Sequence, residues 1–197
     1  MQKRWPVLAA LLCLALSGCG GHDQPAATPS AAPTAINQLR TAQMHVVRVA
    51  FCDLVPRASV RAALAGPPTS SHAWHNGDPV PGAGADVGHE FGCAWSGAQG
   101  RVARAWVFAR PVSPAFARTL VADARNRRGC TAATGGLGTP SVRQSCVRKG
   151  SPTRIRLAGL FGETWLSCEV GAKGSTSTLA KRADAWCVSV ANALNAG

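Results

Sequence analysis

The number and spacing of its cysteines restrict the fold of this chain more than any other feature. The sequence contains eight cysteines. Cys13 and Cys19 lie in an apolar N-terminal segment, and the other six are spread along the rest of the chain, at Cys52, Cys93, Cys130, Cys146, Cys168 and Cys187. An even set of cysteines in a chain exported to an oxidising compartment is typical of a disulfide framework. A disulfide-stapled domain is therefore expected if the chain is exported.

The N-terminal segment has the layout of an export signal. Two basic residues, Lys3 and Arg4, precede an apolar run over residues 7–16, and the small residues Ser17 and Gly18 follow it. A membrane-spanning helix needs about 20 apolar residues, so this run is too short to remain as an anchor. The sequence therefore predicts that the segment is processed during export.

Residues 16–19, LSGC, resemble the lipobox of bacterial lipoproteins, in which the cysteine thiol is acylated and becomes the first residue of the mature chain. Cys19 is the predicted lipidation site, whereas Cys13 fits less well because bulky Leu12 precedes it. Two acyl chains provide stable membrane attachment. The resemblance implies a protein anchored to the extracytoplasmic face of the cell membrane. The alternative is an ordinary secretory signal that is cut a little later, after Pro25.

Three segments follow from this interpretation. Residues 1–18 are the predicted lipoprotein signal peptide, residues 19–40 the lipidated cysteine with a flexible stalk, and residues 41–197 an extracytoplasmic domain. The stalk is rich in Ala, Pro, Ser and Thr and holds too few large apolar residues to offset the entropy of ordering. The remainder has the size of one domain with one core.

The chain is strongly basic, with 21 Lys and Arg against 9 Asp and Glu and a formal net charge of +12. Such a charge favours anionic partners: nucleic acid, an anionic membrane face or an anionic surface polymer. Export argues against nucleic acid. The alternative is compositional, because the preference for Arg, Ala and Gly is also what a high-GC genome would produce.

The pattern of apolar residues predicts an α+β domain in which helices pack on an antiparallel sheet. Helices are expected within residues 53–66, 113–129 and 175–197, with Gly66 and Gly129 ending the first two. Residues 69–88, with many Gly, Pro, Asn and Asp, are expected to form a long loop, and residues 131–140 a Gly-rich loop. Strands are expected at residues 88–97, 101–111, 141–149, 153–161 and 163–171.

Six cysteines allow fifteen pairings, and the sequence does not choose among them. We favour one set because each bond would join predicted elements. Its first bond connects the start of the first helix to a strand, its second closes the Gly-rich loop, and its third fastens the last helix to the sheet. The pairs are Cys52 with Cys93, Cys130 with Cys146, and Cys168 with Cys187.

Two short motifs resemble a family of actinobacterial secreted lipoproteins of unknown function. They are Cys52-Asp53-Leu54-Val55-Pro56, leading into a short helix, and Cys93-Ala94-Trp95 on a predicted strand. Members of that family combine a lipobox, a Pro/Ala-rich stalk, a C-x-L-L-x-P motif and a C-x-W strand. This chain departs from them in having Val55 where leucine is usual and in carrying more cysteines. The resemblance brings no established activity.

No catalytic motif is recognisable, so the sequence favours a non-enzyme without a cofactor. His89-Glu90 does not begin an HExxH motif, and neither GxSxG nor a phosphate-binding loop is present. The candidate acids Glu90, Glu163, Glu169 and Asp184 lack a diagnostic spacing. Three histidines, His72, His75 and His89, are the weak candidates for a metal site; the alternative is that they are solvated loop residues around Trp74.

Four tryptophans fall in predicted helices or strands, at Trp95, Trp106, Trp165 and Trp186. Most are expected in the core of so small a domain. Trp106 and Arg104 share one strand face and are instead candidates for a groove that takes a ligand with an apolar body and an acidic group.

These observations favour a membrane-anchored module of the cell envelope that binds or senses a protein partner or a small molecule. The alternatives are an envelope enzyme or accessory hydrolase acting on wall polymer, and a metal-binding receptor. Convergent titratable side chains beneath Trp106 would favour the enzyme, and an apolar or basic open face would favour the binding module.

Overall fold

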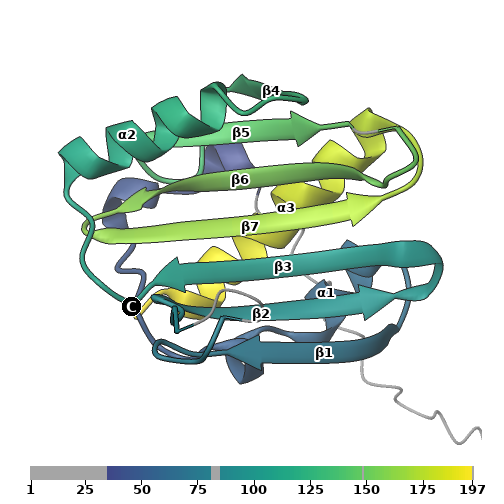
Figure 1. Ribbon diagram of the computed structural model, residues 1–197, viewed down its shortest axis with the longest axis horizontal. Coiled ribbons are helices and arrows are strands. Elements are labelled where there is room, and N and C mark those ends of the chain that lie inside the picture. Colours follow the sequence, from purple (N-terminus) through teal and green to yellow (C-terminus); the bar gives the residue numbers. More distant parts are fainter. Residues whose placement is uncertain (1–34, 81–84, 148, 197) are drawn as a thin grey trace, which may run out of the picture. The chain divides into compact units, whose positions relative to one another are not determined.

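The computed structural model describes residues 35–80, 85–147 and 149–196, which form one sheet flanked by helices (Figure 1). The predicted lipidation site Cys19 lies outside the described residues. The α-helices are α1 (Arg57–Leu64), α2 (Pro114–Arg125) and α3 (Thr176–Leu194). The strands are β1 (Pro68–Trp74), β2 (Glu90–Gly97), β3 (Arg101–Phe108), β4 (Cys130–Ala133), β5 (Ser141–Cys146), β6 (Thr153–Phe161) and β7 (Thr164–Ala172).

The seven strands form a single sheet in the order β1-β2-β3-β7-β6-β5-β4, and every neighbouring pair is antiparallel. Two meanders, β1 to β3 and β4 to β7, meet where β3 pairs with β7. Helix α2 carries the chain from the first meander to the outer edge of the second (Figure 1). The predicted α+β architecture with an antiparallel sheet is confirmed.

Helices α1 and α3 cover one face of the sheet, which we call the α1/α3 face (Figure 1). Alternate strand residues that point to this face are apolar and fully buried, as at Ala103, Ala105 and Val107 of β3. Trp186 of α3 packs edge-on against Trp95 of β2, with ring centroids 5.4 Å apart. The larger hydrophobic core of the domain therefore lies on this face.

Helix α2 lies on the opposite face, the α2 face, where it contacts β4, β5 and β6. Ser113 caps this helix by accepting a hydrogen bond from the Phe116 N–H, and Pro114 occupies its first position. A smaller core that includes Val121 and Trp165 lies beneath it. Among the described residues, no helix covers β1, β2 and β3 on this face (Figure 1).

Three disulfides join the elements in the pairs that we favoured from the sequence, Cys52–Cys93, Cys130–Cys146 and Cys168–Cys187. The first connects the turn before α1 to β2, the second links edge strand β4 to β5, and the third fixes α3 to β7. The prediction of a disulfide-stapled domain is confirmed.

The loop prediction was wrong at two places, both at sheet edges. Strand β1 (Pro68–Trp74) takes up the start of the loop predicted over residues 69–88, and β4 (Cys130–Ala133) takes up the start of the Gly-rich loop predicted over residues 131–140. Both strands are largely exposed, so neither shows the alternation of apolar and polar residues that a half-buried strand has. Their main-chain pairing with β2 and β5 forms them.

Helix ends also differ from expectation. The left-handed residue after α1 is Ala65, one position before Gly66, and α2 ends at Arg125 rather than running to Gly129. Part of the segment predicted as stalk, residues 19–40, belongs to the folded domain, because Ile36 and Leu39 pack against the larger core.

Candidate ligand-binding groove

A groove of about 850 Å³ lies on the α2 face of the first meander, where no helix covers the sheet. Strand register builds its floor in two rows. One row runs through His72, Ala94 and Arg104, and the neighbouring row runs through Trp74, Gly92 and Trp106. The described part of the segment between β1 and β2 contributes Asp78, Pro79, Val80, Val87, Gly88, His89 and, at the start of β2, Glu90.

Gly92 determines how Trp74 lies in this groove. A β-carbon built on Gly92 would collide with the Cζ2 and Cε2 atoms of the Trp74 indole. The indole therefore lies across β2 at Gly92, where a side chain is absent. Trp106 lies opposite Gly92 on the other side, so the glycine separates two indoles that line one groove.

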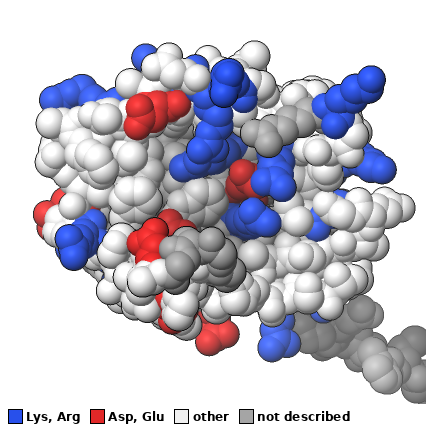
Figure 2. All heavy atoms as spheres, viewed as in Figure 1, with Lys and Arg blue, Asp and Glu red and all other residues white. Residues whose placement is uncertain are grey.

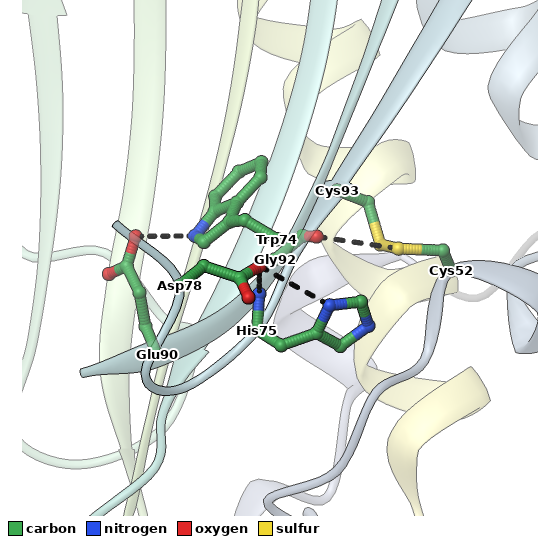
Figure 3. Close-up of polar contacts among 7 residues, drawn as sticks. All are labelled: Cys52, Trp74, His75, Asp78, Glu90, Gly92 and Cys93. Carbon is green, nitrogen blue, oxygen red and sulfur yellow. Dashed lines mark hydrogen bonds and ion pairs between the residues drawn. A yellow bond between two sulfur atoms is a disulfide. The ribbon is translucent and has the colours of Figure 1, made fainter. Parts of the chain in front are cut away.

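Polar contacts fix the orientation of Trp74. Its Nε1–H donates a hydrogen bond of 2.9 Å to Glu90 Oε1 (Figure 3). The His72 ring stacks on the indole with centroids 6.1 Å apart. Burial raises the pKa of Glu90 above its usual value of 4.5, whereas the hydrogen bond from Trp74 and the charge of Arg156 oppose this rise. The carboxyl is thus both an orienting acceptor and a titratable group of the groove wall.

Trp106 makes a cation–π contact with Arg156. The Arg156 guanidinium, which comes from β6, lies 4.8 Å from the centroid of the indole, a contact worth about 0.5 to 2 kcal/mol. Arg156 Nη2 donates to Ser167 Oγ at 3.2 Å, while its buried Nε has no hydrogen-bond partner among the described residues. Burial and the charge of Arg127 lower the pKa of Arg156, and Glu169 and Glu90 oppose that change.

Charged side chains continue from the groove across the sheet. Arg104, Glu169 and Arg156 are aligned on β3, β7 and β6. Glu169 Oε1 lies 3.6 Å from Arg154 Nη1, which is an ion pair beyond hydrogen-bonding distance. Figure 2 shows Lys and Arg side chains gathered near the centre of this view with acidic atoms between them. The face beside the two indoles is therefore predominantly cationic.

The main chain of Arg104 is hydrogen-bonded to a residue of the larger core. Trp186 of α3 donates its indole N–H to the Arg104 carbonyl oxygen at 2.9 Å. The main chain of β3 is thus fixed on the α1/α3 face, while the Arg104 side chain lines the groove on the other face. Within the described residues, that guanidinium takes part in no hydrogen bond or ion pair.

The candidate metal ligands do not converge. His72 and His89 line the groove, but His75 pairs instead with Asp78, its Nδ1 lying 3.4 Å from Oδ2, and its main-chain N–H donates to the same carboxylate (Figure 3). In the ranges that the structure covers, no three His, Cys, Asp or Glu side chains are grouped so as to hold a metal ion.

Figure 3 also shows the Cys52–Cys93 disulfide beside the Gly92 carbonyl. The Cys52 Sγ lies 3.4 Å from the Gly92 carbonyl oxygen, and because it is bonded to Cys93 it has no proton to donate. The contact places the main chain of β2 directly against the first disulfide. The floor of the groove is thereby tied to the segment that leads into α1.

Sequence reasoning placed Arg104 and Trp106 together, and the structure has both in the groove. It missed Trp74 and Arg156 as their neighbours. The alternation in TRIRL, where Ile155 and Leu157 are buried, could have placed Arg154 and Arg156 on the face away from the larger core. No comparable signal exists for Trp74, because β1 lacks a buried face.

The chain matches no protein-family model, and no curated protein is significantly similar to it in sequence. Among the described residues, no helix has both the length and the apolar character needed to cross a membrane.

Proposed function

We propose that this protein is a lipid-anchored, extracytoplasmic binding protein whose groove takes up a small molecule with a flat apolar body and an anionic group. The observation that carries the proposal is that Trp74, Trp106 and Arg104 line one uncovered groove, with the incompletely paired Arg156 guanidinium against the Trp106 ring beside it. Trp74 and Trp106 provide the apolar surface. Arg104 and Arg156 provide the charge.

The two kinds of surface match different parts of such a ligand. Aromatic rings stack on or pack edge-on against an indole, and a pair of indoles favours a planar ligand body. A carboxylate accepts charge-assisted hydrogen bonds from a guanidinium, which are about twice as strong as bonds between neutral groups. Mostly apolar pockets with a few polar groups of this kind are typical of small-molecule sites.

The carboxylates of the groove support binding rather than acid–base catalysis. Glu90 accepts the hydrogen bond from Trp74, and Asp78 accepts the one from the His75 main chain. Each carboxylate thus orients a neighbouring residue of the protein.

Isothermal titration calorimetry with naphthoate, an aromatic carboxylate, tests the proposal. The full-length protein is expected to bind it, and Trp106→Ala is expected to weaken binding by about tenfold, the loss of one good aromatic contact. Arg57→Ala, which removes an exposed charge from α1 on the other side of the sheet, is the matched control and is expected to bind like the parent. Equal affinities of all three proteins would contradict the groove as the site.

The proposed anchor has its own test. Cell fractionation of the parent protein should place it with the membrane, and Cys19→Ser should move it to the soluble extracytoplasmic fraction, because the thiol that carries the lipid is gone. If both proteins fractionate alike, the secretory signal described above replaces the lipobox interpretation.

A further inference from the structure

A second cavity, of about 470 Å³, lies beside the turn between β2 and β3 and shares no lining residue with the groove. Three of its five lining residues are cations from different elements. Arg101 begins β3, Lys173 follows β7, and Arg182 lies on α3. Gln99 and Ala172 complete the lining. The cavity therefore brings together three positive charges that are far apart in the sequence.

These cations have no carboxylate to neutralise them within the described residues. The ion pairs among the described residues involve the cationic side chains of Arg48, His75, Arg143 and Arg154. None of them involves Arg101, Lys173 or Arg182. Like charges around one cavity raise the local concentration of anions. An uncompensated cluster of this kind is stabilised when an anion occupies it.

Arg101 is held in place before any ligand arrives. Arg101 donates from Nε to the Ala98 carbonyl at 3.0 Å and from Nη1 to the Ala65 carbonyl at 3.1 Å. Arg182 Nη1 is buried and has no hydrogen-bond partner among the described residues. A buried donor without a partner is costly, so the Arg182 guanidinium gains an acceptor if it turns toward an anion in the cavity.

We propose that Arg101, Lys173 and Arg182 form a binding site for a phosphate group, either of a free phosphorylated molecule or of an anionic lipid headgroup. We call these three residues the anion site. A phosphate offers several acceptor oxygens and about two negative charges, which matches two guanidinium groups and one ammonium group. The anion site is separate from the groove and does not depend on the function proposed for it.

Calorimetric titration of the full-length protein with pyrophosphate tests this site. The parent is expected to bind pyrophosphate, with an affinity that falls as salt is added. Arg182→Met should lower the affinity by about tenfold or more because it removes the donor that lacks a partner. Arg182→Lys, which keeps the charge, should recover part of the loss. Lys181→Ala, an exposed neighbour on α3 that does not line the cavity, is the control for overall charge.

The variants separate a defined site from a diffuse positive field. Loss of pyrophosphate binding in Arg182→Met and Lys173→Ala, with binding retained in Lys181→Ala, supports the anion site. Absence of binding by the parent overturns the proposal, and so does an equal loss in Lys181→Ala. Circular dichroism of each variant distinguishes loss of the site from loss of the fold.

Vesicles identify the source of the phosphate. If vesicles of phosphatidylglycerol bind the parent and Lys181→Ala but not Arg182→Met, the site takes a lipid headgroup. If pyrophosphate shows the same variant pattern while the vesicles do not, the site takes a soluble phosphate. Trp106→Ala should behave like the parent in both experiments, because Trp106 belongs to the groove.

Discussion

Gly92 shows how one residue can determine the shape of a binding groove. The Trp74 indole occupies the space where any other residue would place its β-carbon, so the glycine is required by packing rather than by an unusual backbone angle. Without it, the indole would have to leave the floor of the groove. The position thereby couples local stability to the proposed binding function.

Gly92→Ala is expected to destabilise the protein by about 1 to 3 kcal/mol, the usual cost of overpacking. Gly97→Ala on the same strand is the matched control. The backbone at Gly97 is extended, and a β-carbon there would have its nearest contact at 3.5 Å, with Leu64. Urea unfolding compares the two variants with the parent. Equal stabilities of both variants would show that Trp74 does not lie against Gly92 as described.

Glu90 is the residue through which pH should act on the groove. Its pKa is raised, so between the usual value of 4.5 and the raised value the folded protein holds a proton that the unfolded chain releases. The stability due to this carboxyl therefore falls as pH rises through that window. Gln at this position can still accept the hydrogen bond from Trp74 but does not titrate.

Glu90→Gln is accordingly expected to gain stability relative to the parent as pH increases from about 4 to about 7. Free energies of unfolding from urea titrations at several pH values measure the difference. A difference that stays constant across this range, or that shrinks toward neutral pH, would contradict a carboxyl whose charged form is disfavoured by burial.

The candidate site could be predicted from sequence only where side chains alternate on a half-buried strand. In β3, buried Ala103 and Ala105 identify Arg104 and Trp106 as residues of the other face. Trp74 escaped prediction because its strand is exposed on both faces. Arg156 contacts Trp106 only because β7, which lies far from β3 in the sequence, pairs with both β3 and β6.

At the scale of elements, the helices and the five inner strands could be predicted because each buries an apolar face. The edge strands β1 and β4 could not, since main-chain pairing forms them without a buried face. Helix α1 illustrates the limit at element ends: Ala65 adopts the left-handed conformation usually taken by glycine, although Gly66 follows it. Propensity alone places such a boundary one residue late.

The disulfides should differ in what they contribute to these elements. Cys130–Cys146 and Cys168–Cys187 have similar sequence separations, 16 and 19 residues, so their effects on the unfolded chain should be alike, about 3 kcal/mol each. Cys168 and Cys187 are fully buried between β7 and α3, whereas Cys130 and Cys146 are half-buried at the sheet edge.

Replacing both cysteines of a pair with alanine should therefore cost more for Cys168 and Cys187, because a cavity adds to the lost cross-link. Thermal and urea unfolding of the two double variants measure this. A smaller loss from the buried pair than from the edge pair would contradict the packing described for α3.

For the domain as a whole, the feature that creates the groove is the unequal covering of the two faces of the sheet. Helices α1 and α3 close one face over a continuous core, and α2 covers only the second meander on the other. The first meander is left with two indoles and a cationic flank facing solvent. Apolar surface of this kind, rimmed by charge, is typical of binding sites.

The most direct test of the groove is an NMR titration of the tryptophan indole N–H signals with naphthoate. Signals from Trp74 and Trp106 are expected to shift and saturate together, because both rings line the groove. Trp165 and Trp186, which are buried in the two cores, are expected to stay unchanged. If naphthoate leaves Trp74 and Trp106 unmoved, or shifts only the buried pair, the groove is not the binding site.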